Sequence, residues 1–246
     1  ICMNQFWHIL FLGIAFFQML FMMAQWFLFG RKEYFFYIAY IFFAAVYIFF
    51  RLHAATDLLN FSIHPWLLEW LDQPMAILSY YMYLLFTRHF LSLKHLQPQA
   101  YRYSRAIEVI FLIFLFGKTL SIPLEISQSL SAYIYMGSVL IMAALVVPMV
   151  VMMLRQKNIL NNFVVMGSIC YIGGGLVGMF VAILWPAKAI GNASILLGME
   201  IGILAELLLL NTGFVLKNRI LQQQVIQGQQ KLLDQLMKEK KDQFPE

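Results

Sequence analysis

Residues 206–236 read "ELLLLNTGFVLKNRILQQQVIQGQQKLLDQL", which begins as apolar sequence and ends as sequence rich in glutamine and charge. Neither a proline nor a cluster of turn-forming residues separates the two halves. Because such residues are what normally ends a helix, we predict one continuous helix here. It leaves a lipid bilayer and extends into water.

The composition of the 246-residue chain is that of a membrane protein. Hydrophobic residues make up 62% of it and charged residues only 12%, whereas an average soluble domain has roughly 25% charged residues. Several uncharged runs exceed the roughly 18–20 residues that cross about 30 Å of hydrocarbon as a helix. No segment alternates as a barrel strand does, so we predict an all-α, polytopic bundle of seven transmembrane helices.

The predicted spans are residues 6–29, 34–52, 66–89, 104–124, 130–154, 162–185 and 190–216. Residues 1–217 then form a seven-helix transmembrane domain, and residues 218–246 form a cytoplasmic linker helix. Two prolines, Pro74 and Pro148, fall inside the third and fifth predicted spans. There they are expected to free a backbone carbonyl and kink the helix.

Basic residues indicate the orientation of the chain. Most of the 17 lysines and arginines face the cytoplasm if the N-terminus lies outside and the C-terminus inside, as the positive-inside rule requires. We therefore predict a multi-pass membrane protein with this orientation, whose net charge of +5 reflects topology and not nucleic-acid binding. The fourth span is the weakest, because only nine uncharged residues separate Glu108 from Lys118. His89 and His95 lie in the basic inner loop and are expected to face anionic lipid headgroups beside Arg88 and Lys94.

An apolar stripe runs along the predicted cytoplasmic helix. At about 100° per residue its side chains fall on one side, and glutamines and charged residues take the other. The stripe consists of Leu221, Val225, Ile226, Leu232, Leu233 and Leu236. Several members lie eleven residues apart, which favours a straight or slightly right-handed bundle. A second copy of the chain would cover the stripe, so we predict a parallel homodimer; an amphipathic helix lying on the inner leaflet is the alternative.

Small residues recur at intervals of four in the sixth and seventh spans. Gly174 and Gly178 form one such pair, and Gly198 and Gly202 form the other. This spacing is typical of transmembrane helices whose backbones approach closely. The alternative is that these glycines only loosen their own helices.

A few polar residues lie within the apolar spans and are candidates for a polar switch. Glu200 and Glu206 lie near the middle of the seventh span, where a carboxyl group must be protonated, hydrogen-bonded or paired. Six residues of separation puts them about 120° apart on the helix, so we do not expect a shared site. Lys118, Asn211 or a tyrosine could supply the partner. The interaction is either a switch that changes between states or a static contact between helices.

A cluster of polar and aromatic residues surrounds the second outer loop and could bind a ligand or dock a sensor domain. It consists of Arg51, His53, Trp66, Glu69, Trp70 and Asp72. An ordinary interfacial aromatic belt is the alternative. The spacing of the histidines and acids matches no tight ligand motif, so we expect no metal site.

The chain carries no motif that would indicate an enzyme or a cofactor. Nucleophile elbows, zinc-protease motifs and phosphate loops are all absent. Cys2 and Cys170 give no disulfide framework. A helix that is rigid across the membrane boundary can transmit displacement or rotation, so our first hypothesis is a signal transducer. A transporter or carrier that uses Glu200 and Glu206 as a proton or ion relay is the second.

Three stretches resemble the membrane domain of bacterial seven-transmembrane receptors with diverse intracellular signalling modules. They are "YFFYIAYIFFAAVYIFF" in the second span, "LLFTRHFLSLK" at the exit of the third, and "GMEIGILAELLLLNTGFVLKNRI" in the seventh. The second contains Phe86, Arg88, Phe90 and Leu91 in the family's Phe-x-Arg-x-Phe-Leu arrangement, and the third contains Gly202, Glu206 and Arg219. Asn211 departs from the small hydroxyl residue that the family has there.

The resemblance implies a signal-transducing module of a bacterial inner membrane that forms part of a longer receptor. An extracytoplasmic sensor domain would precede the chain. A cytoplasmic output domain, such as the histidine kinase of a two-component system or a cyclase, would follow it.

Overall fold

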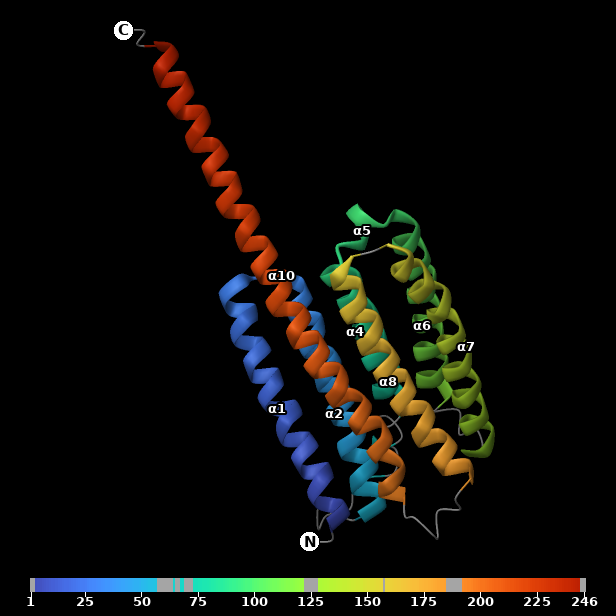
Figure 1. Ribbon diagram of the computed structural model, residues 1–246. Helices are drawn as coiled ribbons and strands as arrows, with labels where there is room; N and C mark the ends of the chain where they lie inside the picture. Colours follow the sequence, from blue (N-terminus) through green and yellow to red (C-terminus); the bar gives the residue numbers. More distant parts are fainter. Residues whose placement is uncertain are drawn as a thin grey trace.

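The computed structural model describes residues 3–56, 64, 67–68, 73–121, 128–156, 158–184 and 192–243. Within these residues the chain is all-α (Figure 1). The helices are α1 (Met3–Phe29), α2 (Lys32–Thr56), α4 (Gln73–Phe90), α5 (Leu93–Leu96), α6 (Pro98–Ser121), α7 (Gln128–Arg155), α8 (Ile159–Leu184) and α10 (Asn192–Gln243).

The seven long helices of the described part form a closed bundle. Each of them packs against the next one along the chain, and α10 completes the ring by contacting α1 and α2 as well as α8. The two ends of the chain lie at opposite ends of the molecule (Figure 1). The turn between α1 and α2 is tight, because Gly30 adopts a φ of 62° and its N–H donates to the carbonyl of Trp26 at 2.7 Å, which ends α1.

The observed helices follow the predicted spans closely, except that α4 begins later than the third predicted span and α6, at Pro98, earlier than the fourth. The third predicted span starts at residue 66, but α4 begins at Gln73, so that Pro74 is its second residue. Proline is tolerated there, since the first N–H groups of a helix have no intrahelical partner; the expected kink within this span is therefore wrong. Pro148 does lie inside α7.

Four helices of the described part are long and apolar enough to cross a membrane. These crossings are Phe6–Phe29, Lys32–His53, Ile159–Gly178 and Leu196–Lys238, and Ala144–Arg155 forms a shorter apolar segment. The helices α4 and α6 contain several charged residues, such as Arg88 and Glu108, that interrupt their apolar character. For α4, α6 and α7, membrane crossing stays a prediction.

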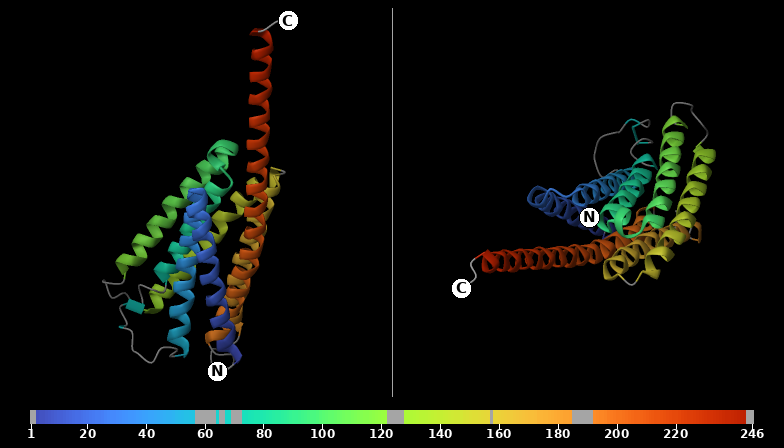
Figure 2. Two further views of the ribbon diagram at one scale, coloured as in Figure 1. Left: turned by 90° about the vertical axis from the view of Figure 1, so that its left-hand side faces the viewer. Right: turned by 90° about the horizontal axis from the view of Figure 1, so that it is seen from above.

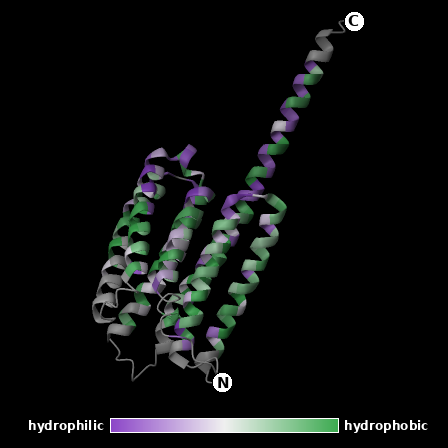
Figure 3. Cartoon of the chain, turned by 180° about the vertical axis from the view of Figure 1, so that it is seen from behind, coloured by the Kyte–Doolittle hydropathy of each residue, from purple (hydrophilic) through white to green (hydrophobic). Residues whose placement is uncertain are grey.

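The last helix continues far beyond the bundle. α10 runs without interruption for 52 residues, about 78 Å at 1.5 Å per residue. Its second half stands clear of the other helices (Figure 2). Apolar residues dominate its part within the bundle, whereas polar and apolar residues mix along the protruding part (Figure 3). This is the uninterrupted helix that the sequence predicts.

Candidate functional site

Polar side chains hold α10 against α1 at two levels. The Nδ1 atom of His8 lies 2.6 Å from Oε1 of Glu200, and both residues are buried. Further along, the side-chain amides of Gln18 and Asn211 exchange two hydrogen bonds of 2.6 and 3.1 Å. Glu200 and Asn211 are eleven residues apart, close to three helical turns, so both reach the same neighbouring helix.

A second face of α10 contacts α2. Glu206 is fully buried, and its Oε2 accepts a hydrogen bond from the Tyr40 hydroxyl. The side chain lies over Gly167 of α8, where an added Cβ would come within 3.2 Å of the Glu206 Cγ. Lys217 follows eleven residues later and also reaches α2. The polar groups of α10 therefore form two rows, one towards α1 and one towards α2.

Glu206 is surrounded by tyrosines from three helices. The Tyr40 ring lies 5.1 Å from that of Tyr83 on α4 and 5.6 Å from that of Tyr171 on α8. The Tyr83 hydroxyl hydrogen-bonds the Ser168 hydroxyl at 2.9 Å, and the Tyr171 hydroxyl lies 3.2 Å from that of Ser79. We define Tyr40, Tyr83 and Tyr171 as the tyrosine cluster. Through this cluster, α2, α4 and α8 all contribute side chains to the surroundings of one carboxyl group of α10.

Removing the Tyr40 hydroxyl is expected to destabilise the bundle by about 1–3 kcal/mol, because a Tyr40→Phe substitution removes the donor to Oε2 of the buried Glu206 carboxyl. The matched control is Tyr37→Phe, since the Tyr37 hydroxyl is also buried but has no hydrogen-bond partner among the described residues. The control should change stability little. Denaturant unfolding of the purified protein in detergent, followed by circular dichroism, measures both; equal losses would contradict the role given to Tyr40.

A clamp holds α10 where it leaves the bundle. The Lys217 ammonium lies 2.8 Å from the Glu33 carboxylate of α2 and donates to the carbonyl of Phe90, the last residue of α4, at 2.7 Å. It also lies 4.8 Å from the centre of the Phe90 ring. We call Glu33, Phe90 and Lys217 the exit clamp.

The residues beside the exit clamp add further contacts. The Asn218 side-chain amide donates to the Tyr34 hydroxyl at 2.9 Å, and its oxygen accepts from Arg31 at 3.3 Å. One turn earlier, the Phe214 ring lies 4.9 Å from the rings of both Tyr34 and Phe90. The base of α10 is thus fixed to α2 and α4 by polar and aromatic contacts together.

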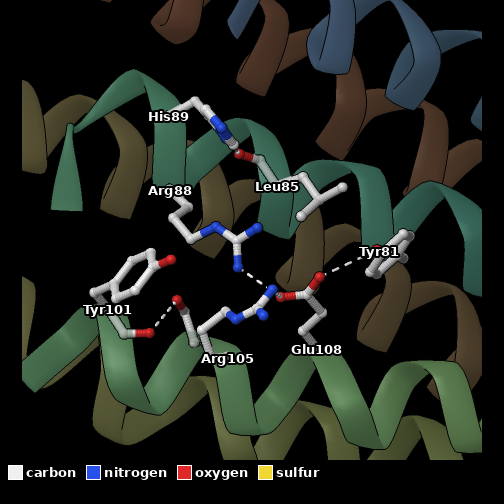
Figure 4. Close-up of polar contacts among 8 residues, drawn as sticks. Tyr81, Leu85, Arg88, His89, Tyr101, Arg105 and Glu108 are labelled. Atoms are coloured by element: carbon white, nitrogen blue, oxygen red, sulfur yellow. Dashed lines mark hydrogen bonds and ion pairs between the residues drawn. The ribbon is translucent and has the colours of Figure 1, made fainter. Parts of the chain in front are cut away.

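A network of charges joins α4 to α6 (Figure 4). The guanidinium groups of Arg88 and Arg105 lie 2.6 and 2.8 Å from the Glu108 carboxylate, to which the Tyr81 hydroxyl also donates at 3.3 Å. Arg88 is buried in this contact. Arg88 therefore lies inside the bundle, whereas headgroup contacts of His89 and His95 stay a prediction. Its partner Glu108 is the residue that made the fourth span weak.

These contacts place the Phe-x-Arg-x-Phe-Leu residues in the core. Phe86, Arg88, Phe90 and Leu91 are all buried, and both phenylalanines contact Phe214 of α10. A family model described as 7TM diverse intracellular signalling matches residues 4–217. The chain belongs to this family. No curated protein and no solved structure matches it.

Membership of the 7TM diverse intracellular signalling family makes the chain a multi-pass membrane module of a signalling receptor. The matched residues end at Lys217 of the exit clamp. The family domain therefore includes every polar contact of α10 described above except those of Asn218. The protruding part of α10 follows it.

The structure separates the four candidates for an intramembrane polar switch of this 7TM domain. Glu200 contacts His8, Glu206 contacts Tyr40, and Asn211 contacts Gln18. Lys118 lies in the last turn of α6, which packs against α4 and α7. They do not form one site, so these contacts do not support a relay in which Glu200 and Glu206 act together.

The four glycines predicted to pack lie where α8 and α10 meet. A Cβ on Gly174 would lie 2.5 Å from the Gly198 carbonyl oxygen, and one on Gly202 would lie 2.6 Å from that of Cys170. A Cβ on Gly198 would come within 3.2 Å of the Gly178 nitrogen. The two backbones are therefore in direct contact.

Only part of the outer cluster falls within the described residues. Arg51 is exposed at the end of α2, with its guanidinium carbon 5.8 Å from the centre of the Tyr47 ring, and His53 is buried. The remaining members, Trp66, Glu69, Trp70 and Asp72, lie outside the described residues. A ligand or sensor contact at this end stays a prediction.

The apolar stripe on the protruding part of α10 is open to its surroundings. Leu221 is partly exposed, and the other members are between 54% and 59% exposed, namely Val225, Ile226, Leu232, Leu233 and Leu236. So much exposed apolar area on one face of a helix normally marks a contact surface.

Proposed function

We propose that this domain is the transmembrane transducer of a bacterial receptor and that α10 carries the signal across the inner membrane. The N-terminus would face outward, towards a sensor domain, and the C-terminus would lead to a cytoplasmic histidine kinase, cyclase or diguanylate cyclase. All seven long helices would cross the bilayer. One observation carries the proposal: a single uninterrupted helix joins the buried polar contacts of the bundle to the exposed apolar stripe.

The contacts inside the bundle give α10 a defined position. Glu200 and Asn211 meet α1, Glu206 and Lys217 meet α2, and the glycines meet α8. A shift of α1 or α2 relative to the others changes these contacts and therefore moves α10. Small shifts at a packed interface become discrete rearrangements, because such interfaces do not deform continuously.

The continuity of α10 supplies the transmission. A helix transmits rotation or displacement along its axis, which a flexible linker does not. Gly228 is the one glycine between the bundle and residue 243, and it softens the helix by about 1 kcal/mol relative to alanine. The rest of this part of α10 holds helix-forming residues such as leucine, glutamine and lysine.

The apolar stripe supports a parallel homodimer. One chain offers no described residue at this height to cover it, whereas the same stripe on a second copy would. At 100° per residue, Leu236 lies ten whole turns from Glu200 and therefore on the side of α10 that faces α1. In the proposed dimer, the two α10 helices would meet on this side.

The test fuses the chain after Glu246 to a reporter that is active only as a dimer. Alanines inserted after Ile220 rotate the distal helix by about 100° each. Output is expected to fall with two or five inserted residues and to return with seven or eleven, which restore the phase to within about 20°. Output that ignores the phase would count against transmission through α10.

Two sets of substitutions control for dimerisation. Leu232→Gln with Leu236→Gln removes apolar side chains from the stripe and is expected to lower output at every phase. Gln227→Ala with Gln230→Ala changes the opposite face and should leave output unaltered. A purely structural anchor would respond to neither the stripe variants nor the insertions.

A further inference from the structure

A cavity lies between α4, α6, α7 and α8, on the side of the tyrosine cluster away from α2. Its volume is about 60 Å³, and it is partly open. Most of its wall is aliphatic or aromatic, with Leu84, Phe111, Val146, Met149 and Val165 among the residues. No lysine, arginine, histidine, aspartate or glutamate lines it.

One hydroxyl group in the wall of the cavity lacks a hydrogen-bond partner. Thr87 is buried, and its Oγ1 accepts from or donates to no other described residue. Other helical hydroxyls of this chain donate to a carbonyl three or four residues earlier: Ser104 to Tyr101, Ser168 to Val164 and Thr212 to Leu208. A buried hydroxyl without a partner costs free energy, so a molecule that supplies one is favoured here.

We propose that this cavity binds the polar end of an uncharged amphiphile, a hydroxyl or carbonyl group on a short aliphatic chain, with Thr87 as its hydrogen-bonding residue. An anionic headgroup does not fit, because the wall offers no positive charge. Water is disfavoured, because it would leave the aliphatic and aromatic side chains that form most of the wall without van der Waals contact. A hydrocarbon tail fills the apolar part but leaves Thr87 without a partner.

The size of the cavity sets how much of the ligand it encloses. An engineered cavity of about 150 Å³ holds benzene, so about 60 Å³ encloses fewer heavy atoms than that. The cavity therefore takes the polar group and the first carbons of a chain. The rest of the chain extends through the open side.

The position of the cavity links it to the signalling helix. Tyr83 and Tyr171 form part of its wall, and both belong to the tyrosine cluster around Glu206. Ser168, which hydrogen-bonds Tyr83, lines the cavity as well. A ligand bound beside Thr87 thus touches residues of the tyrosine cluster, which surrounds Glu206 of α10. This link to output rests on the proposed function, but binding itself does not.

Photolabelling tests the site without any signalling readout. The purified full chain in lipid nanodiscs is irradiated with an eight-carbon alcohol that carries a diazirine, and labelled residues are mapped by mass spectrometry. Labels are expected on cavity residues such as Met149 and Val165, and 1-octanol should compete for them. Competition by octane or by octanoate as strong as that by 1-octanol would overturn the proposal, because the site would then take hydrocarbon or carboxylate equally well.

Substitutions at Thr87 separate a built site from partitioning into lipid. Thr87→Val keeps the shape but removes the hydroxyl, so cavity labelling is expected to fall about fivefold to tenfold, as for the loss of one neutral hydrogen bond. Thr87→Ser restores the hydroxyl and should restore labelling. Thr212→Val, on the exposed face of α10, is the matched control and should leave labelling unchanged. Equal labelling in Thr87→Val and the unsubstituted chain would overturn the proposal, whatever the phase experiment shows.

Discussion

Alanine at Gly174 or Gly202 is expected to destabilise the bundle by about 1–3 kcal/mol, the usual range for overpacking a tight core. The added Cβ at either position would lie within 2.6 Å of a backbone carbonyl oxygen of the facing helix. Backbone atoms of two packed helices do not move aside as the end of a flexible side chain does. The helices α8 and α10 would have to separate, which removes van der Waals contact along their whole interface.

Neighbouring glycines in α8 provide matched controls. Gly173 and Gly175 flank Gly174 in sequence, yet a Cβ on either meets no atom within 4 Å. Gly173→Ala and Gly175→Ala should therefore keep stability or raise it by up to about 1 kcal/mol, since alanine favours a helix over glycine. Thermal unfolding in detergent followed by circular dichroism ranks the variants. If Gly174→Ala and Gly173→Ala unfolded at the same temperature, the close contact between α8 and α10 would make no contribution to stability.

The helices were predictable from the sequence because each apolar run is long and is bounded by charged or turn-forming residues. The start of α4 was not, since Trp66 and Trp70 extend the apolar run to the N-terminal side of Pro74. The local rule that proline favours the first turn of a helix is the signal that could have placed it. The continuity of α10 was predictable for the opposite reason, as no residue near Lys217 interrupts it.

The partners of the buried polar residues were not predictable. Glu200 and Asn211, like Glu206 and Lys217, are eleven residues apart, so helical periodicity alone assigns them to two faces of α10. Periodicity does not say which helix each face meets. His8 and Gln18, ten residues apart in the first span, were the available signal, because polar residues in a span must find partners inside the bundle.

The pairing of Arg88 with Glu108 was not predicted. Arg88 was counted only among the basic residues of a predicted inner segment, and Glu108 was taken as a weakness of the fourth span. The two meet because α4 and α6 are adjacent and antiparallel, joined by the short α5 segment. The register of that connection decides the pairing, and hydropathy does not encode it.

Breaking the exit clamp from one side is expected to have the second large effect. Lys217→Met leaves the Glu33 carboxylate in a site that is only 11% exposed without its ammonium partner. Leaving one member of a buried pair uncompensated typically costs more than the pair contributes, on the order of 3 kcal/mol. The variant also loses the hydrogen bond to the Phe90 carbonyl, which lies at the end of α4 where no helical N–H follows to satisfy it.

A double substitution separates the charge effect from simple loss of packing. Lys217→Met combined with Glu33→Gln removes both charges and is expected to recover most of the lost stability. Arg219→Met, an exposed basic residue two positions further along α10, should change stability by less than about 0.5 kcal/mol. If the double variant were no more stable than Lys217→Met, the two charges would not be coupled.

The same variants bear on transmission, because the exit clamp lies between the bundle and the protruding helix. With Lys217→Met, the base of α10 keeps its aromatic contacts through Phe214 but loses its charged tie to α2. The fused reporter should then depend less on the state of the bundle, while its dimerisation through the apolar stripe persists. If Lys217→Met abolished dimerisation instead, the exit clamp would be needed to hold the apolar stripe in register, since the stripe itself is unchanged in this variant.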